Sequence, residues 1–379
     1  MRRKRNMKIG MMTFHASHNC GSMLQAFALQ HTLIEKFGYD AEIIDFSNNA
    51  QRNMYGLWNK KLRPGIIKRN LKLMPYYNLI QSEIQDYEEF KKKYFVLTNK
   101  SYKKAKELSA VAEKYDLLLA GGDQIWNTRC GDADEAYFLC FNHTKPKVAY
   151  APSLGAKNIN LIEDKDKYKK DLLEFRQLSV REPNGKKWLE QLTGKEIPII
   201  PDPVILMNKE EWEKAIPIDE IEEDFIFCYA FSYDDTYNNR IFQEISRKTG
   251  LPIYVINSRQ WGLNRLDQYG IKLYKTSGPQ TYLSLMKSAK IIFSQSFHGT
   301  LFASLFEKNF WHFGNRVVVD KDDDRAMAML QQMGLTSRYR KIDELLQQDL
   351  FEEIDYTKAR EIREDMRQRG LEYIVQNIY

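Results

Sequence analysis

The chain alternates short apolar runs with amphipathic stretches, which is the pattern of an α/β protein. Residues 8–14 and 41–46 are the first apolar runs and are predicted strands, and residues 21–37 between them carry apolar side chains at the spacing of a helix face. A strand, a helix and a strand of these lengths form a βαβ unit, so a parallel sheet is expected. Further strands of this first series are predicted at 116–120, 147–151, 178–180 and 197–200.

A second series of apolar runs begins at 225–231 and predicts a second sheet of similar build. The predicted fold class is therefore α/β, with two Rossmann-type, doubly wound domains. We expect the first domain at 7–205 and the second at 206–350, and we expect the helix within 351–379 to pack back on the first domain. The further strands of the second series are predicted at 252–256, near 271, at 291–293 and at 310–313.

The most informative stretch of the second series is KIIFSQSFHGTLFASLF, residues 290–306. A strand is predicted at 291–293, a polar turn at 294–299 and a helix at 300–306, which places His298 beside the positive end of a helix dipole. Such a position favours bound phosphate or carboxylate, and histidine delivers a proton readily near pH 7. The alternative interpretation is a capping turn in which His298 bonds to the backbone.

Two turns of the first series are also candidate ligand sites. The loop 15–21 follows the first strand at its carboxyl end, where open α/β sheets bind ligands, although Asn19 or Gly21 in this loop would equally cap the next helix. The turn 121–127, GGDQIWN, begins with paired glycines that allow a ligand to approach the backbone closely. Arg181 ends a further predicted strand and can hold a carboxylate or phosphate, or it forms an ion pair with Glu182 or another acid.

The composition excludes several classes of protein. The 379 residues are 43% hydrophobic, enough for two cores, and the net charge of +6 suits anionic small molecules or a membrane surface. No nucleic-acid-binding motif is present, and the four cysteines show no CxxC or zinc-ligand pattern. The basic N-terminus is followed by an apolar run too short for a signal peptide, so we expect a soluble, cytoplasmic protein.

The segment 46–82 stands apart because it contains no Asp or Glu. Its aromatic residues are interleaved with basic ones, a composition that suits an anionic membrane interface or an extended anionic glycan. A solvated insertion within the first domain is the alternative. The basic residues are Arg52, Lys60, Lys61, Arg63, Lys68, Arg69 and Lys72, and the aromatic ones are Tyr55, Trp58, Tyr76 and Tyr77.

Taken together, the motifs resemble those of the polysaccharide pyruvyl transferases. The resemblance implies a GT-B-like arrangement of two Rossmann-type domains facing across a cleft, with phosphoenolpyruvate as donor. It also implies a sugar or lipid-linked oligosaccharide with two free hydroxyls as acceptor, and a cyclic pyruvate ketal of a capsule or exopolysaccharide as product. The motifs are HASHNCGSMLQAFALQ at 15–30, GGDQIWN at 121–127, SVRE at 179–182, DPV at 202–204 and SFHGT at 296–300.

The resemblance also implies roles for individual residues. His298 would be the general acid, and no metal or cofactor is implied. Arg325 is preferred over Lys308, Arg316 and Lys321 as a further cation, with Asn315 as a weaker companion, and the acids of 320–324 are interpreted as a solvated loop. Cys20 and Gly122 depart from the family's usual residues at ligand turns. Donor binding is predicted for Arg181, Arg325, Ser296, Gly299 and Thr300, and acceptor binding for Asn19, Gly21, Asp123 and Gln124.

Two other functions remain open from the sequence. A glycosyltransferase of similar build, sialyltransferase-like and using a nucleotide-activated sugar, would use the same two domains and His298, but no acidic residue is convincingly placed to hold a ribose. A non-catalytic glycan-binding protein would have no need of a titratable histidine beside an anion site. We expect no nucleic-acid partner, and we expect peripheral contact with the inner membrane surface.

Overall fold

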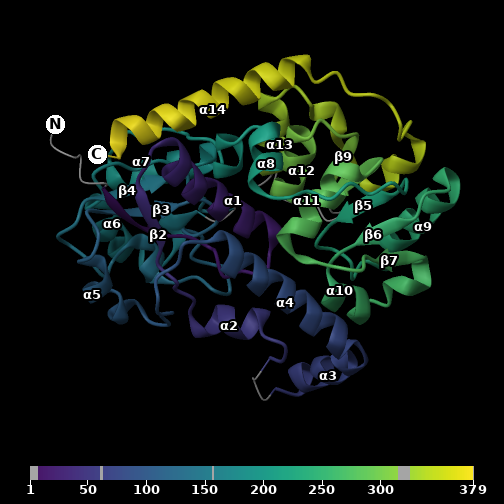
Figure 1. Ribbon diagram of the computed structural model, residues 1–379, viewed down its shortest axis with the longest axis horizontal. Helices are drawn as coiled ribbons and strands as arrows, with labels where there is room; N and C mark the ends of the chain where they lie inside the picture. The colour runs from purple at the N-terminus through teal and green to yellow at the C-terminus, as the bar shows by residue number, and fades with distance from the viewer. Residues whose placement is uncertain (1–6, 60–62, 156–157, 315–324, 379) are drawn as a thin grey trace. The chain divides into compact units, whose positions relative to one another are not determined.

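The computed structural model describes residues 7–59, 63–155, 158–314 and 325–378. The chain forms two compact units, and each unit contains one parallel sheet (Figure 1). The predicted α/β fold with two parallel-sheet domains is therefore confirmed. The first unit consists of Met1–Tyr55, Lys91–Met207 and Glu364–Tyr379, and the second consists of Gly56–Phe90 and Asn208–Arg363.

The sheet of the first unit has the strand order β2-β1-β3-β4. Ile9 of β1 pairs with Ala41 of β2 on one side and with Leu117 of β3 on the other, so the strand order reverses between β1 and β3. Beyond β4, single bridges join Val148 to Gln177 and Val180 to Ile199, and these bridges replace the two last predicted strands. The strands are β1 (Lys8–Met12), β2 (Asp40–Ile43), β3 (Leu117–Gly121) and β4 (Lys147–Tyr150).

Helices cover both faces of this first sheet, which explains why its strands are apolar almost throughout. Leu118 and Ala120 of β3 share one core with Leu172 of α6 and Leu189 of α7. On the opposite face, Gly121 lies directly against Leu29 of α1. The helices are α1 (Cys20–His31, continued by a π-turn at Thr32–Lys36), α2 (Asn49–Tyr55), α5 (Ser109–Ala112), α6 (Lys165–Leu173) and α7 (Pro183–Thr193), with short 3₁₀ helices at Ala105–Glu107, Glu135–Phe138, Ile159–Leu161 and Pro203–Leu206.

The sheet of the second unit has the order β10-β9-β8-β5-β6-β7, the strand order of a Rossmann fold. The chain builds one half of the sheet through β5, β6 and β7 and then returns to β8, so the order reverses between β5 and β8. Phe242 of α9 packs on one face against Phe293 of β8, and Tyr282 of α11 packs on the other against Phe227 of β5. The strands are β5 (Ile226–Tyr229), β6 (Ile253–Val255), β7 (Ile271–Leu273), β8 (Ile291–Ser294), β9 (Phe310–Gly314) and β10 (Tyr339–Lys341).

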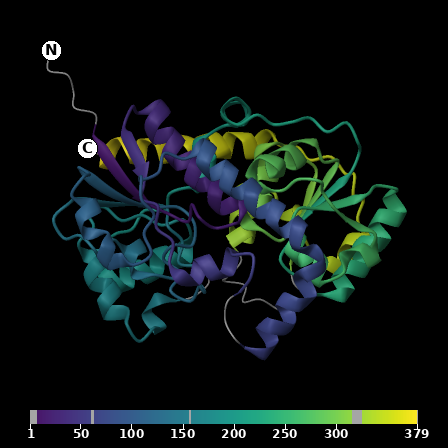
Figure 2. The same ribbon diagram turned by 60° about the horizontal axis from the view of Figure 1, so that its bottom comes forward.

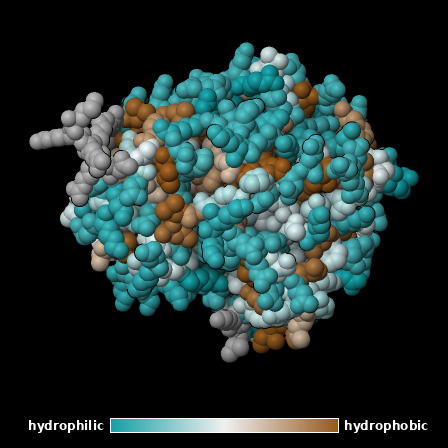
Figure 3. Space-filling view, viewed as in Figure 1, coloured by the Kyte–Doolittle hydropathy of each residue, from teal (hydrophilic) through white to brown (hydrophobic). Residues whose placement is uncertain are grey.

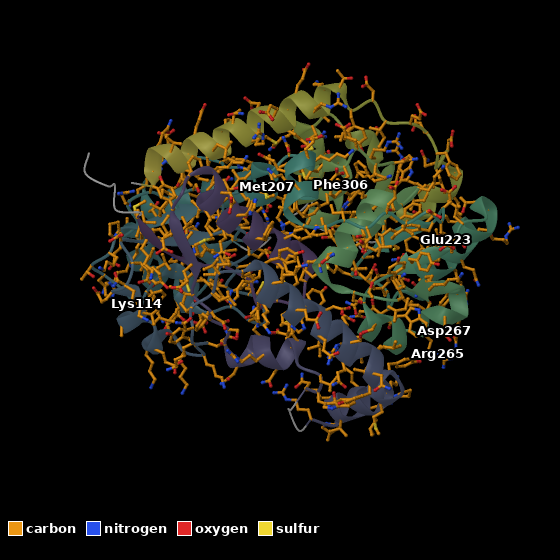
Figure 4. All side chains as sticks on the ribbon, viewed as in Figure 1. Lys114, Met207, Glu223, Arg265, Asp267 and Phe306 are labelled. Carbon is orange, nitrogen blue, oxygen red and sulfur yellow. The ribbon has the colours of Figure 1, made fainter. Side chains whose placement is uncertain are left out.

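Most helices of the second unit follow its strands. The turn before β7 carries an exposed ion pair between Arg265 and Asp267 at 3.4 Å, and Figure 4 labels both residues. The helices are α8 (Lys209–Ala215), α9 (Thr236–Thr249), α10 (Ser258–Leu263), α11 (Gly278–Ser288), α12 (Phe297–Leu305) and α13 (Arg325–Gln332), with 3₁₀ helices at Leu266–Tyr269, Thr336–Arg338 and Ile342–Gln347.

A helical segment early in the chain also belongs to the second unit. It comprises α3 (Pro64–Leu73), a 3₁₀ turn at Met74–Tyr76 and α4 (Tyr77–Tyr94), drawn as consecutive blue helices in Figure 2. Residues 56–90 cluster with the second unit, whereas the sequence places the whole basic segment 46–82 in the first domain. The order of the residues along the chain does not reveal that this segment belongs to the second unit, because the contacts that fix it are made with residues far along the chain.

The final helix α14 (Thr357–Asn377) begins in the second unit and ends in the first. The hydroxyl of Tyr373 donates to the carbonyl oxygen of Ala149 on β4 at 2.8 Å. Gly370 lies so close to Tyr150 that a Cβ atom on it would be 2.6 Å from the tyrosine hydroxyl oxygen. The last turns of α14 therefore pack closely on β4 of the first unit.

Candidate functional site

In the second unit, the candidate site lies where the strand order reverses. Open α/β sheets bind ligands at the carboxyl ends of the strands on either side of such a point. Here these strands are β5 and β8, and Gln295, directly after β8, joins their loops. Its side-chain oxygen accepts hydrogen bonds from the backbone N–H groups of Phe231 and Ser232, both at 3.0 Å, and from the Ser232 hydroxyl at 2.8 Å. The sequence analysis did not single out Gln295, although it lies in the predicted polar turn 294–299, directly before SFHGT.

Helix α12 begins at this same edge of the sheet. Ser296 is its N-cap, and its hydroxyl oxygen accepts a hydrogen bond from the backbone N–H of Gly299 at 3.3 Å. The helix starts at Phe297, three residues earlier than predicted, because this cap turns the residues after Ser296 into helix. The positive end of the α12 dipole therefore lies at the reversal point, where it favours a bound anion.

His298 lies within the first turn of α12 and is buried. The ring of Phe297 packs edge-on to its imidazole, with 5.3 Å between ring centroids. The hydroxyl of Tyr282 on α11 donates to the backbone carbonyl oxygen of His298 at 3.4 Å. His298 therefore stands at the strand-to-helix turn predicted for it, with its backbone held by Tyr282.

The next two residues of the motif fit this turn closely. A Cβ atom on Gly299 would collide with the Ser294 hydroxyl and lie 3.2 Å from the ring of Tyr229, so a larger residue would fit only if these side chains moved. The buried hydroxyl of Thr300 donates to the Ser296 carbonyl oxygen at 3.0 Å and also lies 2.8 Å from Nδ1 of His312. Both residues thus shape the turn, and their direct contact with a donor stays a prediction.

In the first unit, the corresponding reversal point lies between β1 and β3. Asp123 follows β3 with a positive φ of 46°, after Gly122 with a φ of 69°. The Ser22 hydroxyl of α1 donates to Oδ2 of Asp123 at 2.5 Å. The side-chain amide of Gln25 donates to the Thr13 hydroxyl after β1 at 2.9 Å. These side chains therefore link the two predicted ligand turns of the first unit.

The other predicted acceptor residues lie around the same turns. Asn19 caps α1 through a hydrogen bond from the backbone N–H of Ser22 at 3.2 Å, and Gly21 is buried in the first turn of this helix. The side-chain oxygen of Gln124 accepts a hydrogen bond from the amide of Asn127 at 2.9 Å. Capping by Asn19, one of the two interpretations of the sequence, is thus what the structure shows, and acceptor contact stays a prediction.

Arg181 forms a buried ion pair with Asp202, which brings the SVRE and DPV motifs together. Its Nε lies 3.8 Å from a carboxylate oxygen of Glu182. Burial alone would lower the pKa of Arg181, but Asp202, Glu182 and Asp123 together raise it, so the guanidinium is held charged. The influence of Asp123 shows that Arg181 stands within electrostatic reach of the β3 turn.

A second group of polar residues in the first unit was not predicted as a group from the sequence. The Gln51 amide of α2 donates to the Ser17 hydroxyl at 3.1 Å and to a carboxylate oxygen of Asp132 at 3.2 Å. Burial raises the pKa of Asp132, and the charge of Asp123 adds to the rise. Burial and the charge of Asp132 likewise raise the pKa of Tyr55. No motif marks Gln51 or Asp132, and tertiary packing alone brings them together with Ser17.

Two histidines of the loop 15–21 have internal partners. The Nε2 atom of His15 lies 2.9 Å from a carboxylate oxygen of Asp45, and Nδ1 lies 3.2 Å from the Thr13 carbonyl oxygen. The ring of His18 packs on the ring of Tyr55, with 5.4 Å between centroids. His15 is fully buried, and its two ring contacts support the loop.

Arg325 is the first residue of α13, and this helix packs against α12. Its predicted contact with the donor stays a prediction. The other predicted features nearby, Asn315, Arg316, Lys321 and the acids of 320–324, lie outside the described residues. Among the residues that the structure does describe, no group of three or more His, Cys, Asp or Glu side chains is arranged to hold a metal ion.

Comparison with known proteins adds a family and a fold. The family model described as polysaccharide pyruvyl transferase matches residues 19–316. No curated protein matches the chain. A UDP co-structure of S. aureus MnaA is 12% identical with a TM-score of 0.54, and covers 98% of this chain and 97% of its own. UDP-GlcNAc 2-epimerase from Neisseria meningitidis bound to UDP-GlcNAc is 13% identical with a TM-score of 0.52. The match covers 98% of this chain and 99% of the epimerase chain. At these identities the two structures show a shared fold alone.

Proposed function

The chain belongs to the polysaccharide pyruvyl transferase family, and we propose that it transfers pyruvate from phosphoenolpyruvate to a sugar bearing two free hydroxyls. The product would be a cyclic ketal in capsule or exopolysaccharide biosynthesis. The observation that carries the proposal is the buried His298 in the first turn of α12, at the reversal point of a Rossmann sheet. A proton donor beside an anion-favouring helix end is what this chemistry requires.

The reaction needs no further reactant. Protonation of the donor's methylene makes the adjacent carbon electrophilic, and the first sugar hydroxyl adds to it. The carbon–oxygen bond to phosphate then breaks, and the second hydroxyl forms the second bond of the ketal. The two sugar hydroxyls release two protons. One replaces the proton that was added to the methylene to form the methyl group, and the other leaves with inorganic phosphate. The protein therefore has to supply a proton, to hold two anionic groups and to exclude water.

The residues of the second unit fit the donor. We assign the proton transfer to His298 and the binding of an anionic group to the first turn of α12, which Ser296 and Gly299 shape. Arg325 at the start of α13 is the proposed cation of this unit. In the first unit, Arg181 stays a proposed anion holder, and its ion pair with Asp202 means that an anion bound there would share the guanidinium with that carboxylate.

The residues of the first unit fit a neutral, hydroxyl-rich acceptor. Asp123 and Asp132 are both buried, and carboxylate oxygens accept hydrogen bonds from sugar hydroxyls. Ser22 orients the carboxylate of Asp123, and Gln51 that of Asp132. We propose that this group, together with Asn19, Gly21 and Gln124, orients the acceptor sugar.

The alternative function is glycosyl transfer from a nucleotide sugar, which we consider because two proteins of this fold are known with UDP or UDP-GlcNAc bound. One feature of the second unit argues against it. Glu83 of α4 accepts hydrogen bonds from the backbone N–H and hydroxyl of Ser258 at the start of α10. Asp86 accepts from the backbone N–H of Ser277 at the start of α11, at 2.8 Å. Two helix N-termini that could receive a diphosphate thus already hold carboxylates of the chain itself.

A thermal-shift comparison tests the proposal without knowledge of the acceptor. A ligand that binds only the folded state at 100 times its Kd stabilises it by about 2.7 kcal/mol. We expect phosphoenolpyruvate to raise the Tm, and CMP, UDP and GDP to leave it unchanged. The rise should shrink in Arg325→Ala and persist in Lys169→Ala, which removes an exposed cation elsewhere. Stabilisation by a nucleotide and none by phosphoenolpyruvate would replace pyruvyl transfer by glycosyl transfer.

We further propose that the protein works in the cytoplasm on an acceptor linked to lipid at the inner membrane surface. Within the described ranges, no helix combines the length and apolar character of a membrane span. A protein that meets a lipid-linked acceptor needs only peripheral contact with the bilayer.

A further inference from the structure

Helix α3 and the turn after it expose a stripe of apolar side chains. Ile67 is 46% exposed, Leu71 61% and Met74 58%. Their spacing of four and then three residues places them on one side of the helix. Leu73, on another side of α3, is buried and provides its anchor to the protein. Helix α3 therefore has apolar side chains on two sides, one facing the core and the other facing solvent.

Positive charge surrounds this α3 stripe of Ile67, Leu71 and Met74. Lys68 and Lys72 each follow a stripe residue directly, and both are exposed, as is Arg63 just before the helix. No acidic residue occurs anywhere in 46–82. Figure 3 shows brown hydrophobic side chains next to teal hydrophilic ones over this part of the molecule.

The stripe is held in place by contacts on the opposite side of the segment. The ring of Tyr76 lies against Gly262 of α10 so closely that a side chain at that glycine would collide with it. The same ring packs edge-on to Trp261, with 5.9 Å between centroids. The guanidinium of Arg259 donates to the carbonyl oxygen of Gly56 at 3.1 Å. Tyr76 and Gly56 thus dock the segment on α10 of the second unit, and much of each stripe side chain stays exposed.

We propose that the α3 stripe and its flanking cations bind the surface of an anionic lipid bilayer. Apolar side chains at the acyl boundary with lysines reaching the headgroups are the arrangement of interfacial helices. A nucleic acid would engage the cations but leave the apolar side chains in water. A second copy of the chain fits poorly, because Lys68 and Lys72 of both copies would meet. Three side chains also cover only a few hundred Å², against about 800 Å² per partner in a stable interface.

Vesicle flotation tests the proposal in the absence of any substrate, so its failure is distinct from failure of the proposed reaction. The full chain is mixed with vesicles of phosphatidylcholine alone or with one third phosphatidylglycerol, at low and at high salt. We expect binding to the anionic vesicles only, weakened by salt. Lys68→Gln with Lys72→Gln should lower the partition coefficient about fivefold for each lysine. Leu71→Asn with Met74→Asn should lower it about tenfold or more.

Matched controls remove the same kinds of side chain elsewhere. Leu161→Asn removes an apolar side chain that is 74% exposed, and Lys169→Gln with Lys170→Gln removes two exposed lysines of α6. These variants should bind vesicles as the wild type does. Equal binding to neutral vesicles, or unchanged binding of both α3 variants, would overturn the proposal. So would a wild-type dimer in sedimentation velocity that Leu71→Asn with Met74→Asn dissociates, because the stripe would then be a contact between copies.

Discussion

The guanidinium of Arg181 and the carboxylate of Asp202 form a buried ion pair in the first unit. Removing one partner of such a pair leaves an uncompensated buried charge, which costs about 3–5 kcal/mol. We expect Asp202→Ala to lower the free energy of unfolding by this amount in urea titrations. The matched control is Lys186→Ala, which breaks the part-exposed pair with Glu190 at 3.2 Å and should leave the free energy of unfolding almost unchanged. Equal losses of unfolding free energy in the two variants would show that the buried pair contributes no more to stability than the part-exposed one.

His298→Gln should separate catalysis from binding. The variant loses the proton donor but keeps a side chain of similar size, so phosphate release from phosphoenolpyruvate in the presence of acceptor glycan should fall by about 10²–10⁴-fold. Thermal stabilisation by phosphoenolpyruvate should remain. His143→Gln, at an exposed histidine paired with Glu174, is the matched control and should keep full turnover. Full turnover of His298→Gln would remove the general acid from the mechanism.

Gly299→Ala should disturb the turn through packing alone. The added methyl group would collide with the Ser294 hydroxyl and crowd the ring of Tyr229, and overpacking of this kind costs about 1–3 kcal/mol. We expect a lower Tm and a weaker shift with phosphoenolpyruvate. Gly65→Ala is the control, because nothing lies within 4 Å of its added Cβ atom and it stands in a helix. An unchanged Tm and ligand shift in Gly299→Ala would contradict the close fit.

The pair of Asp45 and His15 should make part of the stability depend on pH. Burial alone would raise the pKa of Asp45, but the hydrogen bond and charge of His15 lower it below its ordinary value. A carboxylate with a lowered pKa in the folded state stabilises fully above its unfolded pKa of about 3.9. This contribution is lost as the pH falls through the folded pKa. We expect wild-type stability to drop in that acid window, and we expect Asp45→Asn to be less stable at pH 7 with a shallower drop. Parallel pH profiles of the two proteins would refute the role of the pair.

The sequence predicted the fold because its strands are short, apolar and evenly interleaved with helical stretches. The predicted strand 310–313 is β9 of the structure, extended by Gly314. An apolar run alone did not predict a strand where the hydrogen bonds to a neighbouring strand are missing. The predicted strands at 178–180 and 197–200 form only single bridges.

The candidate site was predictable only where a motif marks it. His298 stands at the turn that the pattern of residues 290–306 predicts, since the strand and the helix around it are both encoded locally. Asp132 and Gln51 could not be found in this way, because they come from segments without a motif and meet only in the folded chain. Gln295 was missed for another reason. Its side chain binds backbone N–H groups of the loop after β5, and no sequence pattern reveals such a contact.

The course of α14 has a consequence for how the protein folds during synthesis. The residues that pack on Tyr150 and Ala149 of β4, Gly370 and Tyr373, are translated after the entire second unit. Domains commonly fold in order as they leave the ribosome, the N-terminal one first. Here the first unit reaches the ribosome exit early but waits for the last part of the chain to cover its β4 face. The first sheet can therefore form early, but Ala149 and Tyr150 lack their contacts with α14 until the second unit has been translated.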